Sequence, residues 1–69
     1  MKTHLRDARR AARLTALQLA DAASTLESRV YQIERGRYRA RPEEAAALAA
    51  VLMRPVDELF PAGVQKGRP

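Results

Sequence analysis

The chain has 69 residues, enough for one small domain that buries only about 60% of its unfolded surface, which argues against a large catalytic cleft. Cysteine is absent, so disulfide-stapled secreted folds and cysteine-ligated zinc sites are excluded. No apolar run reaches the roughly 20 residues of a membrane span, and no signal-peptide core follows the N-terminus. We therefore expect a cytoplasmic protein without a membrane anchor.

Charge is distributed unevenly along the chain. Thirteen Lys and Arg residues against eight Asp and Glu residues give a net charge of +5. Ten of these basic residues, but only four of the acidic ones, lie within residues 1–41. The excess favours a polyanionic partner. Eleven of the basic residues are Arg, however, and GC-rich coding produces the same bias, so Arg usage alone does not show phosphate recognition.

The composition predicts an all-α fold, because Ala and Leu dominate and only eight residues are β-branched. We expect five helices, over residues 4–13, 16–23, 26–35, 42–52 and 56–60, in one domain of residues 1–61 with a flexible tail over 62–69. Apolar residues at three- and four-residue spacing form the expected core: Leu5, Ala8, Ala12, Leu14, Leu19, Ala20, Ala23, Leu26, Val30, Ile33, Ala45, Leu48, Ala49, Leu52 and Leu59.

Several residues mark the predicted helix ends. Thr3 can cap the first helix, and Thr15 with Gln18 three residues later has the spacing of a capping box. Gly36 suits the left-handed position after the third helix, and Pro42 suits the first turn of the fourth. The second and third predicted helices, joined by a short turn, therefore form a helix-turn-helix unit whose second helix has a polar outer face.

A gapless pattern runs from Leu5 to Phe60 through Leu5-Arg6-Asp7, Leu14-Thr15, Leu19-Ala20-Asp21, Val30, Ile33-Glu34-Arg35-Gly36, Leu48-Ala49 and Val56-Asp57-Glu58-Leu59-Phe60. With these residues the chain resembles the Cro/repressor-type (Xre-like) helix-turn-helix family. The resemblance implies a lambda-repressor-like DNA-binding fold of five helices, in which the third helix reads bases and the fifth often helps to form a two-fold dimer.

Carried over position by position, the resemblance implies that bases are read by Glu27, Ser28, Tyr31 and Gln32. Glu27 could accept a hydrogen bond from cytosine, or it could form a capping box with Ser24. Gln32 could grip adenine or remain a solvated amide. Tyr31 could touch a phosphate or a thymine methyl group, or it could simply cover the helix.

The resemblance also implies DNA-backbone contacts from the end of the third helix and the loop after it, at Arg35, Arg37, Tyr38, Arg39 and Arg41. The alternative is that this loop is ordinary solvated surface, with Tyr38 shielding it. Arg6, Arg10 and Arg13 are interpreted as surface bases of an exposed helix. Arg9 resembles the first-helix Arg of the family that pairs with the Glu of the third helix, here Glu34, which makes this pair structural.

Four positions depart from the family pattern. Ala16 stands where the family usually has a Gln that meets phosphate. Gly is usual at Ser24, and Ser is usual at Leu26 and at Arg41. We expect these changes to shift the turn geometry and two helix caps by about a residue while leaving the fold intact.

Nothing in the sequence predicts an enzyme, a cofactor or a metal site. No Ser/His/Asp set, glycine-rich phosphate loop or buried carboxylate pair can be assembled. His4 has neither a Cys nor a second His as a metal-binding partner.

We therefore expect a nucleoid-associated transcriptional regulator that binds double-stranded DNA, a repressor acting as a homodimer on a pseudo-palindromic operator. Val56 and Phe60 are the expected dimer interface, because the fifth helix offers more apolar surface than one face needs. Occupancy would be set by the concentration of the protein or by a separate protein partner. The alternative is an antitoxin that neutralises a toxin through its C-terminal half, although Val64 is the only apolar residue larger than Ala after Phe60.

Overall fold

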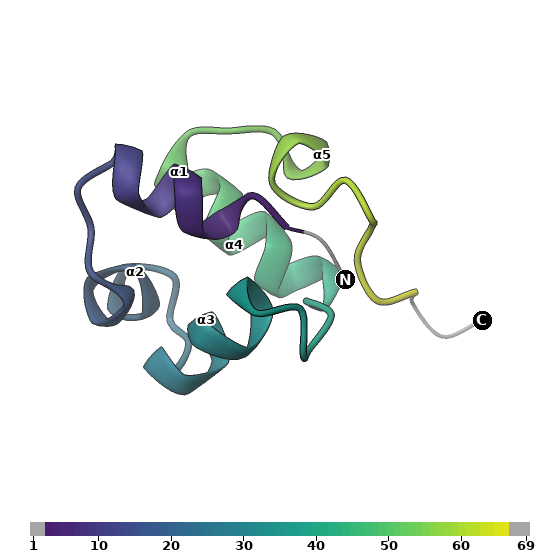
Figure 1. Cartoon of the computed structure of the whole chain (residues 1–69), viewed down its shortest axis with the longest axis horizontal. Helices are drawn as coiled ribbons and strands as arrows, with labels where there is room; N and C mark the ends of the chain where they lie inside the picture. The colour runs from purple at the N-terminus through teal and green to yellow at the C-terminus, as the bar shows by residue number, and fades with distance from the viewer. Residues whose placement is uncertain (1–2, 67–69) are drawn as a thin grey trace.

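The computed structural model describes residues 3–66, which contain five helices and no strand. These are α1 (Leu5–Ala11), α2 (Ala16–Ala22), α3 (Glu27–Glu34), α4 (Pro42–Leu52) and α5 (Val56–Leu59), arranged around one core (Figure 1). The expected all-α fold of five helices is confirmed. The observed helix ends lie within two residues of the expected ones, as is usual for frayed helix termini.

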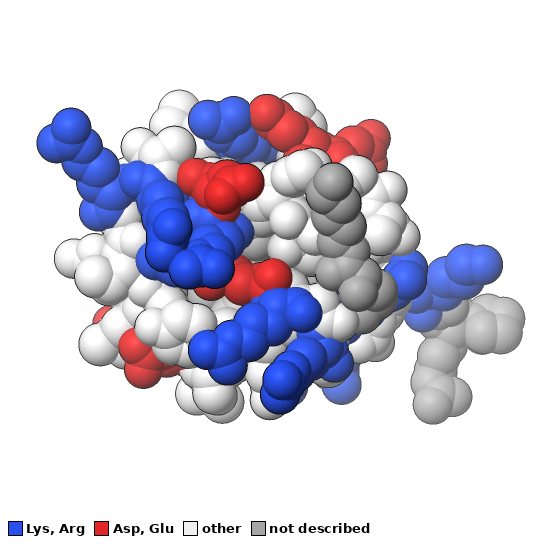
Figure 2. Space-filling model, viewed as in Figure 1, with Lys and Arg blue, Asp and Glu red and all other residues white. Residues whose placement is uncertain are grey.

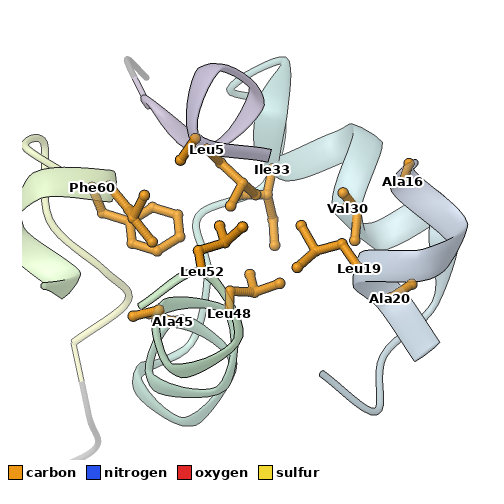
Figure 3. Close-up of a cluster of buried hydrophobic side chains, with 14 residues drawn as sticks. Leu5, Ala16, Leu19, Ala20, Val30, Ile33, Ala45, Leu48, Leu52 and Phe60 are labelled. Atoms are coloured by element: carbon orange, nitrogen blue, oxygen red, sulfur yellow. The ribbon is translucent and has the colours of Figure 1, made fainter. Parts of the chain in front are cut away.

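The core is filled by small and medium apolar side chains from all five helices (Figure 3). Leu5, Leu19, Val30, Ile33 and Leu48 are completely buried. In Figure 3 the side chains of α1, α3 and α4 point toward one another at the centre, and the ring of Phe60 closes one side. No polar or charged residue is buried among the described residues. Burial of apolar surface therefore supplies the main driving force for folding.

The helix-turn-helix unit is held by local hydrogen bonds. The Thr15 hydroxyl accepts the backbone N–H of Gln18 at 3.0 Å, and the Gln18 side chain accepts the N–H of Thr15 at 2.9 Å, so the predicted capping box is confirmed. Gly36 has a φ of +73°, and the N–H of Arg37 reaches back to the carbonyl of Gln32 at 2.9 Å. This is the Schellman geometry that favours glycine.

The expected Thr3 cap and the capping box considered as an alternative for Glu27 are both absent. His4 rather than Thr3 is the N-cap of α1, and its side chain makes no capping hydrogen bond. Leu26 is the N-cap of α3, again without a side-chain bond, so the capping box of Ser24 with Glu27 is not formed. Ser24 has a φ of +58°, the left-handed conformation that explains why glycine is usual at this position.

Two residues of the expected core lie outside it. Leu26 is 68% exposed, because the N-cap has extended dihedral angles that take its side chain off the inner stripe of α3. Ala12 is exposed because α1 ends at Ala11 and the chain turns into a loop through Arg13, at a φ of +58°. Leu14, Ala23 and Val56 are half-buried against the core.

The segment after α5 lies against the loop between α3 and α4. The N–H of Gln65 donates to the carbonyl of Ala40 at 2.8 Å, and its side chain donates to the carbonyl of Arg39 at 2.7 Å. A guanidinium nitrogen of Arg39 donates to the carbonyl of Ala62 at 3.0 Å. The proposed division of the chain after residue 61 stays a prediction, and residues 67–69 of the expected tail lie outside the described residues.

We predict that Leu19→Ala lowers the free energy of unfolding by about 2–5 kcal/mol, because it leaves a cavity where α2 meets the core. Leu17→Ala is the matched control on the same helix, since Leu17 is 51% exposed and its truncation should change stability by about 0.5 kcal/mol at most. Urea denaturation followed by circular dichroism measures both. Equal losses in the two variants would contradict this assignment of the core.

Candidate nucleic-acid interface

The outer face of α3 is polar and unobstructed. Glu27, Ser28, Tyr31 and Gln32 are all exposed, while Val30 and Ile33 on the opposite face are completely buried against α2 and the rest of the core. The four candidate base-reading residues therefore share one outward surface. They offer a carboxylate, a hydroxyl, a phenol and an amide, which are groups that can bond to base edges.

The outer face of α3 continues into a groove toward the loop that follows it. The groove has a volume of about 530 Å³ and is lined by Ser28, Tyr31, Gln32, Arg35, Arg37 and Tyr38. It thus combines three candidate base-reading residues with three of the candidate phosphate-binding residues. Arg35 lies 5.6 Å from the centre of the Tyr31 ring, which keeps its guanidinium beside the base-reading candidates.

A part-buried ion pair joins α1 to the end of α3. The Nε of Arg9 donates to Glu34 at 2.6 Å, and a second guanidinium nitrogen donates to the same carboxylate at 3.3 Å. The side chains are only 12% and 4% exposed. A third bond runs from Arg9 to the carbonyl of Leu14 at 3.0 Å. The hydrogen bond to Glu34 raises the pKa of Arg9, so the guanidinium stays charged despite its partial burial.

Basic side chains gather over α1 and α3. On the face drawn in Figure 2, Lys and Arg side chains gather over α1 and α3, with a few acidic side chains among them, and further acidic side chains lie along α5. The α5 helix carries Asp57 and Glu58 in its first turn, and Glu58 forms an exposed pair with Arg54 at 2.9 Å. The polar face of α3 is thus bordered by positive charge, as a surface that meets a polyanion requires.

Comparison with known protein families identifies the family to which this arrangement of helices belongs. A family model described as a helix-turn-helix domain matches residues 3–60, most of the chain. The chain belongs to the Cro/Xre-like helix-turn-helix family. No curated protein matches the sequence.

Membership of this helix-turn-helix family makes the protein a DNA-binding domain of the regulator type. It also agrees with the geometry, because α2 and α3 are the two helices of the motif and α3 is the one with an exposed polar face. None of the five helices in residues 3–66 has the length and hydropathy needed to cross a lipid bilayer.

Tyr38 packs against Arg29 and also lines the groove beside α3. The guanidinium of Arg29 lies 3.8 Å above its ring, and Arg29 is also paired with Glu44 of α4 at 2.8 Å. The Tyr38 hydroxyl is buried, with no hydrogen-bond partner among the described residues. The expected contact of Tyr38 with the DNA backbone stays a prediction. Arg29 is a residue that the sequence reasoning missed, and it ties α3, the loop and α4 together.

The remaining loop arginines differ in exposure. Arg37 and Arg41 are exposed, and the backbone N–H of Arg41 is bonded to Glu44 at the start of α4. Arg39 is half-buried and holds the C-terminal segment through Ala62. Of the two exposed arginines, Arg37 is the one that lines the groove beside the base-reading candidates.

The two expected dimer residues, Val56 and Phe60, differ in exposure. Phe60 is only 3% exposed and belongs to the monomer core, because the chain turns inward after α5. In the monomer, little of the Phe60 side chain is left for contact with a partner. Val56 is half-buried, and the most exposed apolar side chain near it in sequence is Met53, at 90%. The expected dimer contact of Phe60 was based on the apolar surface of the fifth helix, and periodicity over four helical residues does not separate its inner from its outer face.

We predict that Glu34→Gln lowers the free energy of unfolding by about 3 kcal/mol, because it leaves the part-buried guanidinium of Arg9 without its counter-charge. The same substitution at the exposed pair, Glu58→Gln, should cost under about 1 kcal/mol. The double variant Arg9→Met, Glu34→Leu should recover much of the loss. Equal costs for Glu34→Gln and Glu58→Gln in urea denaturation would show that the Arg9–Glu34 pair has no special role.

Proposed function

We propose that the protein is a transcriptional repressor that places α3 in the major groove and binds a pseudo-palindromic operator as a homodimer. The exposed polar face of α3, flanked by Arg35 and Arg37 in one groove, is the observation that carries the proposal. Base-edge contacts from Glu27, Ser28 and Gln32 would supply sequence preference, and the arginines would supply affinity for the phosphates.

Homodimerisation is supported by the small size of the reading surface. One α3 helix of eight residues contacts too few base pairs to stand out among about 10⁶–10⁹ competing genomic sites. Two copies related by a two-fold axis would place their α3 helices about 34 Å apart, one turn of B-DNA. The exposed Met53 and the half-buried Val56, at the end of α4 and the start of α5, supply the apolar surface that we assign to the dimer contact.

A base-reading variant and a phosphate-binding variant should differ in how they bind two duplexes, an operator selected from random DNA and a scrambled sequence. Gln32→Ala should weaken operator binding by about 1–3 kcal/mol and relax selection at one base position per half-site, with little change on scrambled DNA. Arg37→Ala should weaken both duplexes alike and reduce the salt slope by about one unit.

The wild-type protein is the decisive control for these two variants. If it selects no sequence from random DNA, the assignment of a specific regulator is wrong. If Gln32→Ala weakens both duplexes equally, Gln32 is a surface amide and the base-reading face lies elsewhere on the protein.

The dimer contact predicts that Met53→Glu and Val56→Glu yield folded monomers that keep weak half-site affinity and lose tight operator binding. The matched control is Leu17→Glu, which places the same charge on an exposed apolar position of α2 and should leave the dimer intact. Analytical ultracentrifugation gives the oligomeric state, and circular dichroism gives the helix content. Dimers in all three variants would locate the interface elsewhere, and a wild-type protein that binds its operator as a monomer would reject homodimerisation.

A further inference from the structure

A second hollow lies between α1 and α3, next to the groove already described. It has a volume of about 290 Å³ and is lined by Arg6, Arg9, Arg10, Tyr31, Glu34 and Arg35. Arg6 and Arg10 are four residues apart on α1, so their side chains lie on one face of that helix. The hollow therefore collects side chains that are about 25 positions apart in the chain.

The lining of this hollow is strongly positive. Its four guanidinium groups face one carboxylate, and that carboxylate, Glu34, is already held by Arg9 through two hydrogen bonds. Three positive charges thus remain uncompensated within the lining. Among residues 3–66, neither Arg6 nor Arg10 forms an ion pair, and both are exposed. Like charges four residues apart on a helix repel each other, so a bound anion would relieve a cost that the free protein carries.

The position of the hollow identifies which anion it meets. It shares Tyr31 and Arg35 with the groove on the base-reading side of α3, so the two depressions are neighbours on one surface. With α3 in a major groove, a group beside the outer edge of that helix faces the sugar-phosphate backbone that borders the groove. Figure 2 shows Lys and Arg side chains gathered over these same two helices.

We infer that Arg6 and Arg10, together with Arg35, hold a DNA backbone phosphate at the edge of the major groove occupied by α3. This inference rests on the proposed function, and it extends the DNA contact surface to α1. The Arg9–Glu34 pair does not bind the phosphate. It neutralises the one carboxylate in the hollow and fixes α1 against α3, so that Arg6 and Arg10 stand at a set distance from the reading helix.

The test is the salt dependence of duplex binding by the double variant Arg6→Gln, Arg10→Gln. Its slope of log K against log salt should be smaller than that of the wild type by about 0.9, the value for one neutralised phosphate. Base selection should be unchanged. Arg54→Gln is the matched control, because Arg54 is an exposed Arg that lies outside this hollow. Its slope should stay within about 0.3 of the wild type, since removal of a distant charge releases no bound counterion from the interface.

Three outcomes would overturn the inference, and each differs from failure of the proposed function. A double variant with the same slope as Arg54→Gln means that Arg6 and Arg10 meet no phosphate. Shifts of the arginine Nε resonances on adding inorganic phosphate, with no change in the DNA slope, mean that the hollow binds a free anion instead. Ethylation interference on the wild-type complex maps the phosphates that the protein contacts. If it detects no contacted phosphate beyond the base pairs that the protein selects, the inferred contact is also excluded. Failure of the wild-type protein to bind any duplex would instead refute the proposed function itself.

Discussion

The ion pair between Arg9 and Glu34 fixes the first helix against the end of the third. Both side chains are mostly removed from water, and Arg9 makes a further bond to the carbonyl of Leu14 at the entrance to α2. A pair in this setting is costly to break, because either partner alone would remain as a part-buried charge. The orientation of α3, and with it the direction of its polar face, therefore depends on α1 as well as on the packing of α2.

This ion pair also helps to explain how so small a domain fixes the orientation of the exposed polar face of α3. The core consists of Ala, Leu, Val, Ile and one Phe, so no large aromatic cluster anchors α3. Polar contacts at the two ends of α3 hold it in place instead. Arg9 holds the C-terminal end, while Arg29 stacks on Tyr38 and pairs with Glu44, which connects α3 to the following loop and to α4. The side chains of α3 outside these contacts include the four exposed base-reading candidates.

Features that depend on neighbouring residues were predicted well from the sequence. The capping box of Thr15 with Gln18 and the left-handed Gly36 each involve a few consecutive residues, so residue type and spacing are sufficient to predict them. The Arg9–Glu34 contact spans 25 positions and came from the family resemblance rather than from spacing. The exposed outer face of α3 follows from the helical period, because Val30 and Ile33 must face inward.

The missed features depend on tertiary contacts. Leu26 was expected in the core because its position continues the inner stripe of α3, but extended dihedral angles at the N-cap take it out of phase. The burial of Phe60 depends on how the chain turns after α5, which periodicity over four residues does not specify. The contact between Arg29 and the Tyr38 ring was also not predicted, because the two residues lie nine positions apart, on α3 and in the loop after it.

The central claim is that the outward face of α3 and its arginine borders form the DNA-binding surface. The most direct test is a comparison of ¹H–¹⁵N spectra of the labelled protein with and without a duplex selected from random DNA. The account predicts that the largest shifts fall on residues 27–32 and 35–37 and on the side chains of Arg6 and Arg10. Shifts concentrated on the acidic side of the molecule around α5, with α3 unchanged, would contradict it.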